Sequence, residues 1–212
     1  EVILQPWMLI DLLPRIAELK RRGFERGITL LPGNNLGYFG QEEALLRSPT
    51  PGGTDHWAGC QAGRFVLGIE SDGAVKGCPS LQTAHYVGGN LKRSRLDEIW
   101  NAAPELGFTR ERGVEALWGF CRGCAFAETC LGGCSFTAPS ILGNPGNTPY
   151  CHFRAKTLAK RGLRERVVST SAATGLPFDN GSFELVVEPF DAPSPPEATP
   201  EGLVQITREA QR

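Results

Sequence analysis

The pattern of apolar and polar residues predicts a helix near the start of the chain. Apolar residues recur at roughly helical spacing over residues 6–22, and charged residues occupy the positions between them. The run Ile28–Leu31 is short, apolar and β-branched at two of four positions, which predicts a buried strand before the break at Pro32–Asn35. A helix, a turn, a buried strand and a polar loop form one step of an α/β barrel or of a doubly wound sheet.

Shorter elements are predicted further along the chain. Residues 65–69 and 74–76 flank Asp72-Gly73, a dipeptide typical of hairpin turns, and predict a β-hairpin. Ser94 is expected to cap a short helix that runs through Leu96, Ile99 and Trp100. Residues 120–151 are rich in Gly, Cys and Pro with little periodicity, which is typical of a loop organised around metal.

The C-terminal part of the sequence predicts one more helix and then a change of character. Residues 153–166 are predicted to close the domain as a helix, and residues 182–188 to form one strand. From residue 168 small polar residues and prolines dominate, so most of 168–212 is expected to be a mobile tail.

Charge and composition exclude several classes of protein. The 212 residues include 22 basic and 23 acidic ones, and 41% are hydrophobic. This balance argues against wholesale disorder and against a nucleic-acid-binding surface spread over the protein. The apolar runs are far shorter than the ~20 residues of a membrane helix, and no signal peptide is visible. Because the chain begins with Glu1 and its one methionine is Met8, we expect a fragment of a longer cytoplasmic protein.

The seven cysteines carry the strongest chemical signal. They read Cys60, twelve residues, Gly73, four residues, Cys78, then Cys121-x2-Cys124-x5-Cys130-x3-Cys134, and finally Cys151. An odd count without an export signal favours thiolate ligands in a reducing compartment over a disulfide scaffold. Soft thiolates select zinc or iron–sulfur clusters, and neighbouring glycines allow backbone amides to point at the sulfurs.

Two simpler interpretations of the cysteines stay open at this level. One zinc ion could use Cys121, Cys124, Cys130 and Cys134, which leaves the other three cysteines unexplained. Packing of free cysteines in a core is less favoured, because their surroundings are rich in glycine and lack a core-like apolar pattern.

The joint cysteine and glycine pattern resembles the seven-cysteine signature of the SPASM domain, the C-terminal extension of many radical SAM enzymes. Further segments resemble the same family: residues 71–75 before Cys78-Pro79, residues 89–91 and 96–100, and residues 143–145 ahead of Cys151. The resemblance implies an irregular, metal-stapled α+β fold with a β-hairpin and short helices. It predicts a remnant of the last α/β unit of a partial TIM-type barrel at 1–50, the SPASM domain at 51–167 and the tail at 168–212.

The resemblance also implies a set of ligands for two auxiliary [4Fe-4S] clusters. The first cluster would be held by Cys60, Cys78 and Cys134, and the second by Cys121, Cys124, Cys130 and Cys151. Seven cysteines leave one ligand position of the first cluster open, for which His56 is the better protein candidate and Asp55 the next. S-adenosylmethionine and a third cluster would bind upstream sequence, since the C-x3-C-x2-C motif is absent and the fragment alone should be inactive.

The function that the resemblance implies is modification of a peptide or protein. A maturase of ribosomally made peptides is favoured over an anaerobic sulfatase-maturing type of enzyme, and a zinc-binding interaction module is the alternative from another class. Expected partners are the peptide or protein substrate and an electron donor such as a flavodoxin or ferredoxin, with no nucleic acid and no membrane. Trp57, Trp100 and Trp118 are expected to shield the clusters, and the basic residues of 154–166 to form a solvated face.

Overall fold

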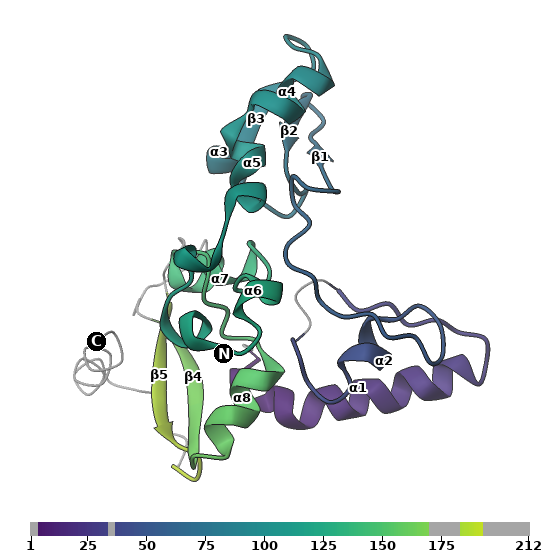
Figure 1. The fold of residues 1–212 in the computed structure, drawn as a ribbon, viewed down its shortest axis with the longest axis vertical. Coiled ribbons are helices and arrows are strands. Elements are labelled where there is room, and N and C mark those ends of the chain that lie inside the picture. Colours follow the sequence, from purple (N-terminus) through teal and green to yellow (C-terminus); the bar gives the residue numbers. More distant parts are fainter. Residues whose placement is uncertain (1–3, 34–36, 170–182, 193–212) are drawn as a thin grey trace.

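The computed structural model describes residues 4–33, 37–169 and 183–192. The molecule is elongated, and one end is formed by residues 68–111, which we call the hairpin lobe; the other elements form the lower lobe (Figure 1). None of the helices in the described ranges has the length and apolar character needed to cross a bilayer. In chain order the elements are η1 (Pro6–Met8), α1 (Leu9–Phe24), α2 (Glu43–Arg47), β1 (Gly68–Ile69), β2 (Ala74–Lys76), α3 (Thr83–Tyr86), β3 (Val87–Asn90), α4 (Leu96–Ala102), α5 (Pro104–Glu111), η2 (Val114–Ala116), η3 (Gly119–Gly123), α6 (Ala127–Cys130), α7 (Thr137–Leu142), α8 (His152–Ala159), β4 (Leu163–Ser169) and β5 (Phe183–Pro189).

The predicted N-terminal helix is confirmed as α1, but the strand predicted after it is wrong. Leu9, Leu13 and Ala17 form the buried face of α1 and pack against α2. Residues 28–31 form no strand, and the side chains of Ile28 and Leu31 are 55% and 70% exposed. A single strand of a parallel sheet needs neighbours for its backbone hydrogen bonds, and no strand of the described chain pairs with this segment.

The predicted hairpin is confirmed and gains a third strand. β1 and β2 pair antiparallel with Gly68 opposite Lys76, and β3 joins β2 on its other side. The turn is closed by a hydrogen bond from Gly73 N–H to Glu70 O, and only Gly73 of the Asp-Gly pair has a positive φ (91°). This geometry is a type I turn followed by a glycine bulge.

The next helix also forms, with a different cap. The N-cap of α4 is Arg95 instead of Ser94, and the backbone N–H of Arg95 donates to the carboxylate of Glu98. Asp97 and Glu98 lie in the first turn, where the helix dipole favours negative charge.

The predicted closing helix over 153–166 is half wrong. α8 ends at Ala159, and the chain turns through Gly162 (φ 72°) into the strand β4. Gly162 takes the left-handed conformation that commonly follows a helix. β4 pairs antiparallel with β5 in the register Leu163 to Pro189, so the strand predicted at 182–188 is confirmed. The other residues of the predicted tail, 170–182 and 193–212, lie outside the described chain.

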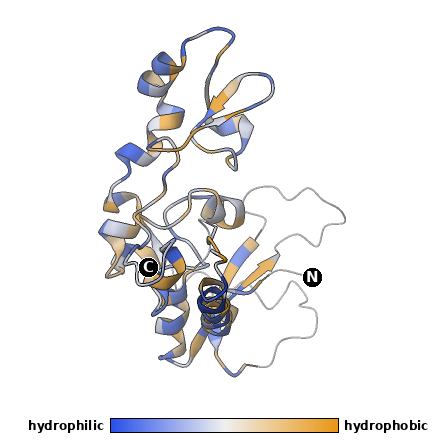
Figure 2. Ribbon diagram, turned by 90° about the vertical axis from the view of Figure 1, so that its right-hand side faces the viewer, coloured by the Kyte–Doolittle hydropathy of each residue, from blue (hydrophilic) through white to orange (hydrophobic). Residues whose placement is uncertain are grey.

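Three small apolar clusters hold these elements. One joins α1 to α2, a second lies among the cysteines, and the third fills the hairpin lobe with Val75, Ile99 and Leu106. Apolar residues are accordingly spread through both lobes (Figure 2). The fold is α+β with small antiparallel sheets, as predicted, and the buried apolar residues of the described segments fall into separate small clusters.

Candidate metal centre

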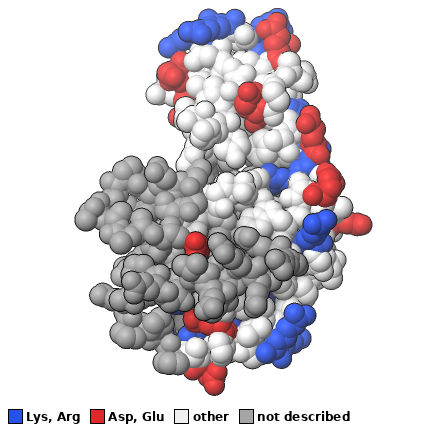
Figure 3. All heavy atoms as spheres, turned by 90° about the vertical axis from the view of Figure 1, so that its left-hand side faces the viewer, with Lys and Arg blue, Asp and Glu red and all other residues white. Residues whose placement is uncertain are grey.

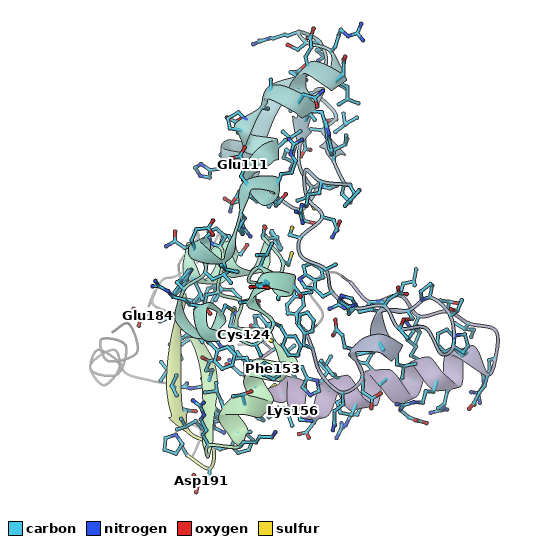
Figure 4. The ribbon with its side chains drawn as sticks, viewed as in Figure 1. Glu111, Cys124, Phe153, Lys156, Glu184 and Asp191 are labelled. Carbon is cyan, nitrogen blue, oxygen red and sulfur yellow. The ribbon has the colours of Figure 1, made fainter. Side chains whose placement is uncertain are left out.

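Three cysteines that are close in sequence and a fourth, Cys151, that follows Cys130 by 21 residues line one small cavity with apolar walls. η3 supplies Cys121, the residue after it is Cys124, α6 ends at Cys130, and Cys151 is the N-cap of α8. The walls include Phe120, Phe126 and Phe153; Figure 4 labels Cys124 and Phe153 at this point of the lower lobe. We call this space the Cys121 cavity.

Backbone amides act on these sulfurs. The N–H of Phe126 donates to Cys124 Sγ. Against the larger effect of burial, which raises the pKa, the backbone amides of Thr148, Gly133 and Arg154 lower the pKa of Cys121, Cys130 and Cys151 respectively. The bond from Phe126 N to Cys124 Sγ is 3.4 Å long. Such donors stabilise thiolates and set the potential of a cluster that the thiolates hold.

Without a positive charge in the cavity, burial opposes the thiolate state. Burial raises the pKa of the Cys151 thiol to about 12, and burial followed by the neighbouring charge of Cys151 raises the pKa of Cys130 further. Burial also raises the pKa of Cys121. Thiolates in this cavity are therefore favoured only when a cationic centre accompanies them.

The donor set of the Cys121 cavity fits an iron–sulfur cluster. Thr148 also lines the cavity, and its buried Oγ1 has no hydrogen-bond partner among the described residues, so this hydroxyl is free to donate to a cluster.

Two of the three cysteines predicted for the first cluster lie around one guanidinium. Cys60 and Cys134 pack against the same aromatic cluster, and both act electrostatically on Arg112. Burial lowers the pKa of Arg112, and the charges of Cys60, Tyr86 and Cys134 oppose this. Arg112 Nη1 donates to Ser135 Oγ, which follows Cys134, over 3.0 Å.

Cys78 is carried by the hairpin lobe. It leaves β2 two residues after Lys76, whose buried Nζ donates to Pro79 O (3.1 Å) and Leu81 O (2.6 Å). The preceding residue, Gly77, accepts a hydrogen bond from Gly63 N–H at 2.9 Å, close in sequence to Cys60. Assignment of the three cysteines to one cluster stays a prediction.

Tyr38 connects the two groups of cysteines. Its side chain is completely buried, its hydroxyl accepts from Cys134 N–H (3.1 Å), and its carbonyl accepts from Cys151 Sγ (3.6 Å). Its ring packs on Trp57, with centroids 5.0 Å apart, and Trp57 Nε1 donates to Cys130 O. Sequence reasoning did not identify Tyr38, which has no motif around it.

The shielding role expected of three tryptophans holds for Trp57 and is wrong for Trp100. Trp57 is buried among the cysteines, whereas Trp100 packs in the hairpin lobe beside Ile99. Trp118 hydrogen-bonds through Nε1 to Pro145 O at 2.7 Å.

The candidate extra ligands, Asp55 and His56, are exposed and line an open groove. Phe39 and Phe126 line both this groove and the Cys121 cavity, and their rings stack at 4.2 Å. The groove therefore lies on the other side of an aromatic wall from the cavity. The ligand role of either side chain stays a prediction.

The solvated basic face predicted for 154–166 is only partly formed, because Lys160 and Arg161 are exposed while other basic residues of the segment are buried or half-buried. Arg154 and Arg164 are only 4% and 8% exposed and are paired with Glu165 and Glu188. Lys156 reaches Gln41. On the part of the face in Figure 3 that is not grey, both basic and acidic side chains are visible.

Comparison with known proteins identifies the class of domain. Residues 60–125 match the model of the SPASM family, an iron–sulfur cluster-binding domain. The matched residues include the first four of the seven cysteines, so this comparison agrees with the resemblance that the cysteine pattern carries. Mycofactocin maturase MftC of Mycobacterium ulcerans (strain Agy99) is 34% identical over 95 residues, which are 43% of this chain and 25% of that protein.

Proposed function

We propose that this chain is the auxiliary-cluster part of a radical SAM enzyme that modifies a peptide or protein. It holds two [4Fe-4S] clusters, one in the Cys121 cavity and one on Cys60, Cys78 and Cys134. S-adenosylmethionine and a further cluster bind sequence outside this chain, because the C-x3-C-x2-C motif is absent from it. The enzyme acts in a reducing cytoplasm and takes electrons from a donor such as a flavodoxin or ferredoxin.

The observation that carries the proposal is the convergence of Cys121, Cys124, Cys130 and Cys151 on one cavity. The convergence includes Cys151, which is 17 residues beyond Cys134 in sequence, and excludes the neighbour Cys134. This is the crossed ligand set that the family resemblance implies. The backbone donors and the Thr148 hydroxyl supply the hydrogen bonds that an anionic cluster needs.

A peptide substrate is supported by the maturase that resembles this chain, and by the open groove beside the cavity. In the assembled enzyme, the chain's own residues would orient the substrate and keep water from the clusters. The clusters themselves supply electron transfer.

The test is metal content with a grouping of cysteine variants. After anaerobic reconstitution the chain is expected to bind about eight irons and matching sulfide, as two cubanes require. Stoichiometric zinc with negligible iron would overturn the proposal in favour of a zinc module.

Single Cys→Ala variants then separate the two sites. Cys134→Ala is expected to remove the same paramagnetic signal as Cys60→Ala and Cys78→Ala, while Cys151→Ala removes the other signal. A loss of one signal shared by Cys134→Ala and Cys130→Ala, with Cys151→Ala inert, would show that neighbours in sequence share a cluster and that the crossing is wrong.

A further inference from the structure

Arg154 is a buried cation directly behind the wall of the Cys121 cavity. It is the third residue of α8, and its side chain is almost completely enclosed. Its Nη1 donates to Asn147 Oδ1 (2.5 Å) and to Thr148 O (3.0 Å), and its guanidinium carbon lies 5.2 Å from the centroid of the Phe120 ring. Phe120 and Thr148 both line the cavity, so one layer of residues separates the charge from the cavity.

The position of Arg154 relates it to the cavity's cysteines. Arg154 follows Cys151 by three residues, and it donates to the carbonyl of Thr148, which lines the same cavity as Cys121 and Cys151. Its Nε is buried without a hydrogen-bond partner among the described residues. One N–H of the guanidinium is therefore not engaged by a described residue, and it lies beside a cavity in which thiolates would place negative charge.

A second element fixes the guanidinium in place. Its Nη2 donates to Glu165 Oε1 of β4 over 2.5 Å, and Glu165 is itself buried. β4 holds Glu165 opposite Val187 of β5. The charge pair thus depends on the sheet formed by 163–169 and 183–189, which lies beyond the residues matched by the SPASM family model.

Four thiolates outweigh the positive charge of an iron–sulfur core, so the ligated cluster is an anion, and each reduction makes it more negative. A fixed cation in a low-dielectric surrounding favours the reduced state, while the partner carboxylate moderates that effect. We propose that the Arg154–Glu165 pair sets the reduction potential of the cluster in the Cys121 cavity. Arg154 raises this potential, and Glu165 holds the guanidinium in place and moderates its effect. This inference rests on the proposed function, since it requires a cluster there.

The test is a redox titration of the full chain, reconstituted anaerobically and followed by electron paramagnetic resonance. Arg154→Gln is expected to move the midpoint potential of one cluster to more negative values, and Glu165→Gln to more positive values. The cluster that moves should be the one that Cys151→Ala removes. Arg154→Lys keeps the charge and is expected to stay closer to the wild type than Arg154→Gln.

Arg164→Gln is the matched control. Arg164 is another buried arginine, paired with Glu188 at 2.8 Å, but its guanidinium lies over Trp7 and donates to Ala192 O. Its loss removes a buried ion pair from the same sheet and is expected to leave both potentials unchanged.

The outcomes separate the two levels of the argument. Wild-type chain without iron–sulfur clusters would overturn the proposed function and this inference together. Clusters whose potentials are unmoved in Arg154→Gln, or a shift of equal size and sign in Glu165→Gln and Arg164→Gln, would overturn only the role of Arg154. If Arg154→Gln fails to fold, the positive shift expected of Glu165→Gln still decides the question.

Discussion

The cluster predicted on Cys60, Cys78 and Cys134 is expected to depend on the small apolar core of the hairpin lobe. Cys78 follows β2, β2 pairs with β3, and β3 packs on α5. The contact is tight, because Leu106 of α5 is completely buried and fills the space above Gly88 of β3. A Cβ at position 88 would overlap Leu106 Cδ1 and lie 2.6 Å from the Cβ of Ala103. We therefore expect substitutions here to release Cys78.

The magnitude follows from the geometry of the pair. Leu106→Ala removes a buried isobutyl group and leaves a cavity, which costs about 2–5 kcal/mol. Gly88→Ala forces an extra methyl into filled space, at a cost of about 1–3 kcal/mol. In the double variant the methyl added at position 88 occupies part of the vacated space. The cost of the double variant is expected to fall short of the sum by about 1 kcal/mol.

Two measurements check this. Amide hydrogen exchange of β2 and β3 gives the free energy of opening for each variant, and iron analysis with electron paramagnetic resonance gives the occupancy of each cluster. Leu106→Ala is expected to lower the occupancy of the cluster that depends on Cys78 and to spare the one in the Cys121 cavity.

A matched substitution in the other lobe provides the control. Leu13→Ala truncates a similarly buried leucine of α1, in a cluster separate from the hairpin lobe. It should lower stability without selective loss of the Cys78 cluster. The reasoning fails if Leu13→Ala depletes the same cluster, or if the costs of Leu106→Ala and Gly88→Ala simply add.

Three further predictions concern two loops that carry cysteines and the contribution of iron to folding. Lys76→Met removes two hydrogen bonds that the buried ammonium donates to carbonyls after Cys78, and each such bond from a charged donor contributes about 1.5–3 kcal/mol. We expect the loop to loosen and Cys78 to be alkylated faster in the cluster-free chain. An unchanged alkylation rate would refute this. Gly132→Ala is expected to prevent cluster assembly in the Cys121 cavity, because Gly132 has a φ of 77° and a Cβ there would lie 2.6 Å from Gly146 Cα. In the control Gly123→Ala the added Cβ meets nothing within 4 Å, so the cluster should assemble as in the wild type. Equal iron content in the two variants would contradict this. Chelation of iron should lower the melting temperature measured by circular dichroism. The described residues form only small apolar clusters, so cluster binding is expected to contribute to the free energy of folding. An unchanged melting temperature would show that the protein folds without its metal.

The sequence alone determined the features that depend on local pattern. The periodicity of 6–22 predicted α1, and Asp72-Gly73 between apolar runs predicted the hairpin, because backbone conformation there follows from nearby residues. The cysteine spacing likewise indicated a metal site with soft thiolate ligands, and its resemblance to the SPASM pattern agrees with the family match over residues 60–125.

Tertiary structure decided where long-range partners were needed. Ile28–Leu31 has the composition of a buried strand, yet a strand exists only where another strand pairs with it. The segment 163–169 became β4 because β5 supplies its hydrogen bonds, and the paired residues are 14 positions apart at Ser169 and Phe183 and 26 apart at Leu163 and Pro189. The same pairing buried Glu165, which fixed Arg154 against the Cys121 cavity. A charge that the linear sequence places on a solvated helix is thereby brought next to the candidate metal centre.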